Sequence, residues 1–138
     1  MKEGVNMANK EIHVDNEDNY IDFSAQSAYA SVIKANECYM IIIRVKGEQV
    51  NIKQLKGELN AERINILSED EATDKFPEYN NTAKMIVQNT YDLPVYISRK
   101  VFNTLDLYIK TGQNSDCKNM SIHTLAEIIS ESNGNIIF

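Results

Sequence analysis

Apolar residues recur at two different spacings along this chain, and the spacings divide it into expected strands and helices. Alternating apolar residues on either side of the polar run 15–19 predict a β-hairpin over 11–23. The run 39–45 is apolar, rich in β-branched residues and too short for a typical helix, so it predicts a buried strand. Shorter apolar runs predict further strands at 49–52, 63–67, 93–97 and 135–138.

Two of these strands carry more specific expectations. Val50 and Ile52 are expected to face the core. Proline cannot donate a hydrogen bond to a neighbouring strand. Pro94 therefore indicates either that the strand 93–97 lies at a sheet edge or that Pro94 is among its first residues. The pattern of residues 53–60 is ambiguous, and residues 85–87 could form a strand or a helix.

The first two expected helices each begin at a serine that suits the N-cap position. Ser24 precedes an apolar stripe that predicts a helix ending near Asn36. The stripe consists of Ala25, Ala28, Tyr29, Val32 and Ile33. Ser68 and Glu71 have the spacing of a capping box, which opens a short helix that must end before Pro77.

The other two expected helices lie toward the end of the chain. Ser98 is the expected N-cap of a helix that stops at Gly112, where glycine favours a left-handed C-terminal cap. Its inward face consists of Val101, Phe102, Leu105, Tyr108 and Ile109. A last helix over 121–132 turns Ile122, Leu125, Ala126 and Ile129 inward. Leu105 is thus expected in the core, where truncation to Ala would cost about 2 to 5 kcal/mol.

Length and composition fit one domain. The chain has 138 residues, of which 43% are hydrophobic and 25% charged, enough to bury a core without disulfides or metals. Residues 1–10 are polar and unpatterned, so we expect a flexible tail followed by a single domain over 11–138. The order of elements predicts a compact α+β fold with a mostly antiparallel sheet and three to four helices.

The charge balance excludes several classes of partner. Twenty acidic against 14 basic residues give a net charge of −6, and the basic residues form no stripe, so direct binding to duplex DNA is not expected. No run approaches a membrane span and the start lacks an apolar leader, so we expect neither a membrane partner nor secretion. Cys38 and Cys117 lie far apart outside any CxxC pair, which predicts free thiols in a cytoplasmic protein.

Motifs that would indicate an enzyme are absent from the sequence. The glycines match no phosphate-binding loop, and no GxSxG nucleophile motif occurs. A zinc site would have to combine His13, Cys38, Cys117 and His123, whose spacings match no structural-zinc pattern. We therefore expect a non-enzymatic protein with no cofactor, no metal and no catalytic residues.

An acidic segment is the strongest candidate for a binding surface. Between Ser68 and Tyr79 the only base is Lys75, and the carboxylates are Glu69, Asp70, Glu71, Asp74 and Glu78. Carboxylates that lie three or four positions apart on a helix repel one another, so local stability does not explain them. We expect this segment, with an exposed Tyr79, to meet a basic partner. A second acidic group could extend it: Asp15, Glu17, Asp18 and Asp22.

These observations favour a small acidic binding protein that inhibits or regulates a host protein. The chain contains 17 Ile, 16 Asn and 11 Lys, residues with A/T-rich codons, which indicates a low-GC bacterium or one of its phages or mobile elements. Anti-defence inhibitors such as anti-CRISPR proteins have this profile, and the host protein could itself bind nucleic acid.

Two alternatives remain open at this point. Arg44, Arg63 and Arg99 are the only arginines, and one or more of them, together with tyrosines, could clamp the phosphate or carboxylate of a small ligand or nucleotide. The pocket would lie beside the strand 39–45 or between the protomers of a homodimer, and the protein would then be a ligand-binding protein or a small enzyme. The chain could instead be an assembly subunit, in which the strand near Pro94 or the segment 136–138 pairs with another copy.

Overall fold

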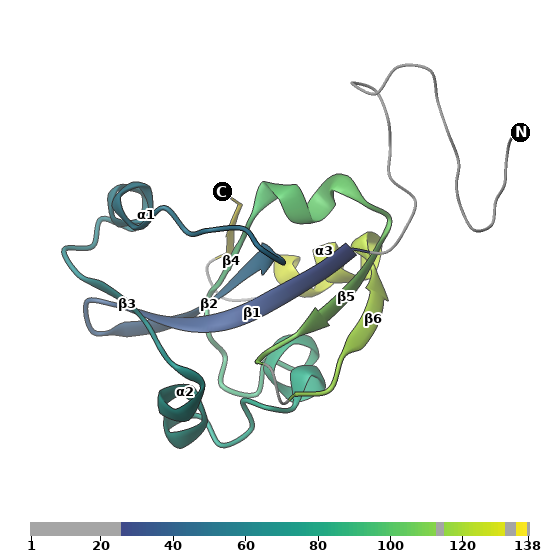
Figure 1. The fold of residues 1–138 in the computed structure, drawn as a ribbon, viewed down its shortest axis with the longest axis horizontal. Coiled ribbons are helices and arrows are strands. Elements are labelled where there is room, and N and C mark those ends of the chain that lie inside the picture. The colour runs from purple at the N-terminus through teal and green to yellow at the C-terminus, as the bar shows by residue number, and fades with distance from the viewer. Residues whose placement is uncertain (1–25, 113–114, 132–134, 138) are drawn as a thin grey trace, which may run out of the picture.

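One mixed β-sheet organises the protein (Figure 1). The structure is a computed structural model that describes residues 26–112, 115–131 and 135–137. The sheet has the strand order β6-β5-β1-β2-β4-β7, and β3 pairs with β1. The strands are β1 (Gln26–Ala35), β2 (Cys38–Val45), β3 (Ile64–Ile66), β4 (Val95–Ile97), β5 (Asp106–Lys110), β6 (Lys118–Ser121) and β7 (Asn135–Ile137). The helices are α1 (Ile52–Leu59), α2 (Glu69–Lys75) and α3 (Ile122–Ser130), with a π-helical turn η2 (Ala83–Val87) and a 3₁₀ turn η3 (Arg99–Asn103).

The α+β fold and its three to four helices are confirmed. Three strand pairings are antiparallel, β1 with β2, β1 with β3 and β5 with β6. Three others, β1 with β5, β2 with β4 and β4 with β7, are parallel. The expected hairpin over 11–23 and the tail over 1–10 lie outside the described residues.

The long hairpin of β1 and β2 forms the centre of the sheet, and it corrects the first expected helix. The strand expected at 39–45 is confirmed as β2, but the helix expected to end near Asn36 is strand β1. Ala28, Ala30 and Val32 are buried on one face in strict alternation, which is the period of a strand. Because β2, β3 and β5 all pair with β1, tertiary hydrogen bonding decides this segment.

The helix expected from Ser98 to Gly112 is also wrong. Ser98 does act as an N-cap, since its side chain accepts a hydrogen bond from the Lys100 amide, but it begins only the short turn η3. Strand β5 follows, with Leu107 and Ile109 fully buried. Because this segment is a strand and not a helix, two residues that were expected in the core lie at the surface. Leu105 is 56% exposed and Tyr108 is 44% exposed.

The remaining expectations divide between confirmed and corrected elements. Strand β3, the capped helix α2, helix α3 and strand β7 are confirmed. The strand expected at 49–52 is wrong, because α1 begins at Ile52 with Asn51 as its N-cap, and Val50 and Ile52 are only half-buried. Within α3, Leu125 and Ile129 are buried as expected, whereas Ala126 is exposed. Pro94 comes directly before β4, which β2 and β7 flank on both sides.

The two faces of the sheet are covered to different extents. On one face, the alternating residues of β1, β2 and β5 pack with Leu125 and Ile129 of α3 in the larger core cluster. On the other face, Ile33, Ile42 and Tyr96 pack with Leu55 of α1 in a smaller cluster. Helix α1 therefore covers one part of this second face, and α3 lies on the opposite side of the sheet (Figure 1).

Candidate functional site

Helix α2 presents the expected acidic segment on the surface of the protein. Ser68 and Glu71 form the capping box: the Ser68 hydroxyl accepts from the Glu71 amide at 3.1 Å, and a Glu71 carboxylate oxygen accepts from the Ser68 amide at 2.9 Å. Asp70, Glu71 and Asp74 are all exposed, while the helix buries Ala72. We call these three carboxylates the α2 acidic surface.

The only base of the segment does not neutralise this surface. Lys75 places its ammonium group 5.3 Å from the centre of the Tyr39 ring, in a cation–π contact. Within the part of the chain that the structure describes, neither Asp70 nor Asp74 forms an ion pair.

Three other residues expected in this surface lie elsewhere. Tyr79 was expected to be exposed but is only 3% exposed and belongs to the core. Glu78 is half-buried, and one of its carboxylate oxygens lies 3.7 Å from the Lys84 ammonium group. Glu69 is half-buried beside Gly112 and Tyr79. The candidate surface is thus smaller than the sequence predicts.

Tyr79 borders the same small gap as residues 30–32 of β1, which lie between the pairings of β1 with β5 and with β3. The Thr111 hydroxyl donates to the Tyr79 carbonyl, and buried Thr82 donates to the carbonyl of Asp116 at 2.7 Å. Burial raises the pKa of Tyr79 to about 12; the charge of Glu69 adds to the rise and that of Arg44 opposes it. Because the phenol is buried and stays neutral, we assign Tyr79 a structural role.

The three arginines do not converge on one pocket. Arg44 pairs with Tyr29 in the centre of the sheet, whereas the Arg63 carbonyl accepts from the Asn36 amide at the tip of the β1–β2 hairpin. Seven strand residues separate these two positions along β1, a distance of about 23 Å. Arg99, in turn, is exposed on η3. Arg44 and Arg63 therefore do not line one pocket within a single chain, and a pocket that uses one of the three arginines stays a prediction.

Arg99 instead lines a polar groove between α1 and η3 with a volume of about 380 Å³. Its lining includes Asn51 and Gln54 from the start of α1, and Lys100 from η3. Glu48 also lines it and accepts a hydrogen bond from the Ser98 hydroxyl at 2.8 Å. These groups could hold a small polar ligand, but neither Arg44 nor Arg63 belongs to the lining.

The described thiols and the described imidazole lie on three different parts of the fold. Cys38 and Cys117 are exposed at the start of β2 and just before β6. His123 lies on α3 with its Nε2 atom 3.5 Å from the Glu127 carboxylate. Among the described residues no three His, Cys, Asp or Glu side chains group closely enough to hold a metal ion. His13 lies outside the described residues, as do Asp15, Glu17, Asp18 and Asp22.

The structure reveals one surface that the sequence does not indicate. On the face of the sheet that α1 covers in part, the strand positions beyond α1 hold the polar residues Ser27, Ser31, Asp106 and Asn119 and a group of aromatic or cationic residues. This group consists of Tyr29, Arg44, Lys46, Tyr108 and Lys110, and we call it the open sheet face. The sequence pattern assigns Tyr29 and Tyr108 to the buried sides of helices, so it conceals this surface.

Comparisons with known proteins bear on the fold alone. No protein-family model and no curated protein matches the chain significantly. Among solved structures, a "Putative signal transduction protein" from Marinobacter aquaeolei VT8 is similar, with a TM-score of 0.61 and 10% sequence identity. The match covers 83% of this chain and 25% of that protein, so this chain spans about a quarter of its length. In the described part of this chain, no helix combines the length and the apolar character needed to cross a bilayer.

Proposed function

We propose that the protein is a non-enzymatic binding domain of a phage or mobile element that inhibits or regulates a host protein through the α2 acidic surface. The observation that carries the proposal is the lack of an ion pair to Asp70 or Asp74 among the described residues, while Lys75 turns away to Tyr39. Uncompensated surface charge contributes more to the rate and specificity of association than to folding.

The chemistry of this surface defines the partner. Exposed carboxylates at positions 70, 71 and 74 lie within about one turn and a half of helix, so they present a compact negative patch. A basic groove of the kind that holds nucleic acid is complementary to such a patch. The host partner is therefore expected to be a protein that itself binds nucleic acid.

A charge-neutralised variant tests the proposal. The triple variant Asp70→Asn, Glu71→Gln and Asp74→Asn removes three charges with little change of volume, and Gln still serves in the capping box. Its folding stability should hold or rise slightly, because like-charge repulsion within α2 is relieved. The partner is first recovered with the wild-type protein from the native host and identified by mass spectrometry, and its association rate is then measured over a range of salt concentrations.

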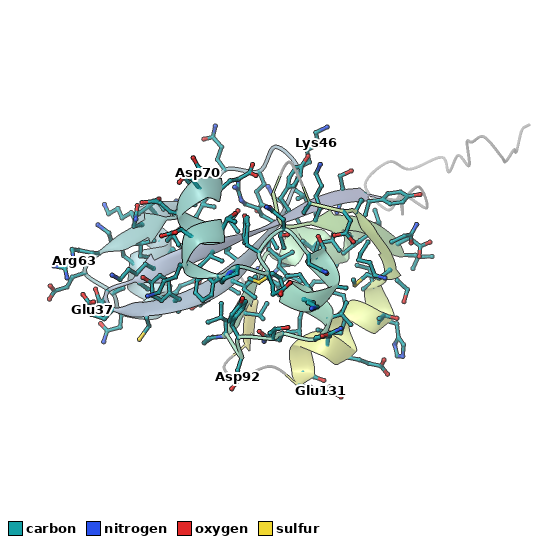
Figure 2. All side chains as sticks on the ribbon, turned by 90° about the horizontal axis from the view of Figure 1, so that it is seen from below. Glu37, Lys46, Arg63, Asp70, Asp92 and Glu131 are labelled. Atoms are coloured by element: carbon teal, nitrogen blue, oxygen red, sulfur yellow. The ribbon has the colours of Figure 1, made fainter. Side chains whose placement is uncertain are left out.

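A matched control removes three charges from the opposite side of the protein. Asp92 and Glu131 lie away from Asp70 (Figure 2). Both are exposed, and so is Glu127, which lies on α3. The control is Asp92→Asn, Glu127→Gln and Glu131→Gln. We expect only the α2 variant to associate more slowly at low salt, with a flatter dependence on salt. Equal rates for the wild type and both variants would exclude the α2 acidic surface as the binding site.

A further inference from the structure

The open sheet face is built by strand pairing and not by local sequence. Ala28 and Val32 of β1 and Ile109 of β5 point into the core under α3, so their neighbours Tyr29 and Lys110 point to the opposite face. The register pairs Tyr29 with Lys110 on one side and with Arg44 on the other. These three residues therefore form a row across β5, β1 and β2.

A second row lies beside the first. Tyr108 pairs with Ser27, and the Ser27 carbonyl accepts from the Lys46 amide at 2.9 Å. Tyr29 and Tyr108 are thus diagonal neighbours on adjacent strands, with their backbones about 7 to 8 Å apart. Tyr108 is exposed and Tyr29 is half-buried, so parts of both side chains are accessible from the same face.

Three cationic side chains belong to the same two rows as these rings. The Lys110 ammonium group lies 5.9 Å from the centre of the Tyr29 ring. Arg44 donates from Nη1 to the Glu48 carbonyl at 2.9 Å, while its Nε is buried and has no acceptor in the described part of the chain. Lys46 is exposed on the side of the molecule away from Glu131 (Figure 2). Among the described residues, no carboxylate forms an ion pair with Arg44 or Lys46.

The face also continues toward the groove between α1 and η3. Glu48 connects the two, because its carbonyl binds Arg44 and its carboxylate binds Ser98 in the groove wall. The groove lining holds two cations, Arg99 and Lys100, and two carboxylates, Glu48 and Glu58, so the groove borders the open sheet face without adding net positive charge.

We propose that the open sheet face binds a single-stranded nucleic acid. Tyrosine rings offer stacking surfaces to bases, and neighbouring Lys and Arg side chains attract the phosphates. This combination fits a single strand better than a duplex, whose bases are already stacked on each other. The net charge of −6 disfavours general nucleic-acid binding, so recognition depends on this local surface. The proposal goes beyond the protein-binding function of α2 and does not depend on it.

Fluorescence anisotropy with labelled oligonucleotides tests the proposal on the full chain. We expect single-stranded DNA or RNA of about 12 nucleotides to bind with a dissociation constant on the order of 10 µM at low salt, and the duplex to bind more weakly. Separate DNA and RNA strands show which sugar is preferred. No measurable binding of either single strand, or equally tight binding of the duplex, would overturn the proposal.

Variants locate the binding surface. Tyr108→Ala should weaken binding by about 5- to 150-fold, while Tyr108→Phe, which keeps the ring, should retain it. Lys46→Gln should reduce the slope of log affinity against log salt by about 0.7. Lys118→Gln is the matched control, because Lys118 pairs with buried Ile109 and so lies on the other face of the same sheet.

Two results would contradict this assignment even if the wild-type protein binds. One is an unchanged affinity for both Tyr108→Ala and Lys46→Gln, with circular dichroism showing that both variants are folded. The other is a homodimer, detected by light scattering, that Tyr108→Ala dissociates, because a second copy of the chain would then occupy this face.

Discussion

Gly112 follows β5 and lies beside the side chains of Glu69 and Tyr79. Replacement of Gly112 by Ala tests how closely these two side chains pack against the backbone. The backbone φ of Gly112 is +146°, a conformation that residues with a side chain rarely adopt. A Cβ atom here would lie 2.9 Å from a Glu69 carboxylate oxygen and 3.1 Å from Cε2 of Tyr79. The carboxylate can move, but the Tyr79 ring is buried in the core. We therefore expect Gly112→Ala to destabilise the fold.

The backbone strain alone is worth about 1 to 3 kcal/mol, and displacement of the Tyr79 ring adds to this cost. In a domain of this size the strain corresponds to a fall of the melting temperature by about 4 to 12 °C. Urea unfolding measured by circular dichroism gives the free energy directly. Comparison of Glu69→Ala with the double variant Gly112→Ala and Glu69→Ala gives the cost of the strain and of the contact with Tyr79 without the contact with the carboxylate.

Gly57 provides the matched control for this experiment. It lies within α1, and a Cβ atom there would meet no atom within 4 Å. Gly57→Ala should stabilise the protein by about 0.5 to 1 kcal/mol, because Ala is a better helix former. If Gly112→Ala unfolds at the same urea concentration as the wild type, or if Gly57→Ala is destabilised to the same extent as Gly112→Ala, then the reasoning about Gly112 is wrong.

Two further predictions concern the core and its response to pH. Leu125→Ala should cost about 2 to 5 kcal/mol because Leu125 is fully buried, whereas Leu105→Ala should change the free energy of unfolding by no more than about 0.5 kcal/mol; equal costs in urea unfolding would contradict the phase of β5. The pKa of Tyr79 is raised from 10.0 to about 12 in the folded state, so the folded protein holds this proton more tightly than the unfolded chain. The resulting stability is complete below pH 10 and falls as the pH rises through about 12. Unfolding curves across this range should show the fall in the wild type and a smaller one in Tyr79→Phe, and identical curves would contradict it.

Elements with strong local signals could be predicted from the sequence. The run that becomes β2 is too short and too β-branched for a helix, and its partner strands only confirm it. The capping box of Ser68 and Glu71 specifies the start of α2 within a single turn, and Pro77 limits its end. Helix α3 shows a spacing that an alternating strand does not reproduce, because Ile122 and Leu125 are three positions apart, Leu125 and Ile129 are four apart, and all three contact the same core. In each case neighbouring residues contain the information.

The two wrong helices have one physical cause. Residues 28 and 32 of β1 fit both a helical stripe and an alternating strand, so the pattern alone cannot separate the two. Ala30 would have decided the matter, because it is buried in the strand but has no place in the helical stripe. Hydrogen bonds from β2, β3 and β5 favour the strand, and their contribution depends on contacts distant in sequence. The same ambiguity explains the wrong burial predicted for Leu105, directly before β5, and for Tyr108 within β5.

One candidate surface consists of residues close together in the sequence, and the other joins residues far apart. Only the first could therefore be predicted. The α2 acidic surface lies within a single short helix, so composition and helical spacing place Asp70 and Asp74 together. The open sheet face joins Tyr29 to Tyr108, which are 79 positions apart, through the parallel pairing of β1 with β5. A parallel pair needs a long connection, and no short-range signal indicates its register. The residues that face the core of a helix are not those that face the core of a strand. Because helices were predicted where β1 and β5 lie, Tyr29 and Tyr108 were assigned to the core, and the surface that they form could not be recognised.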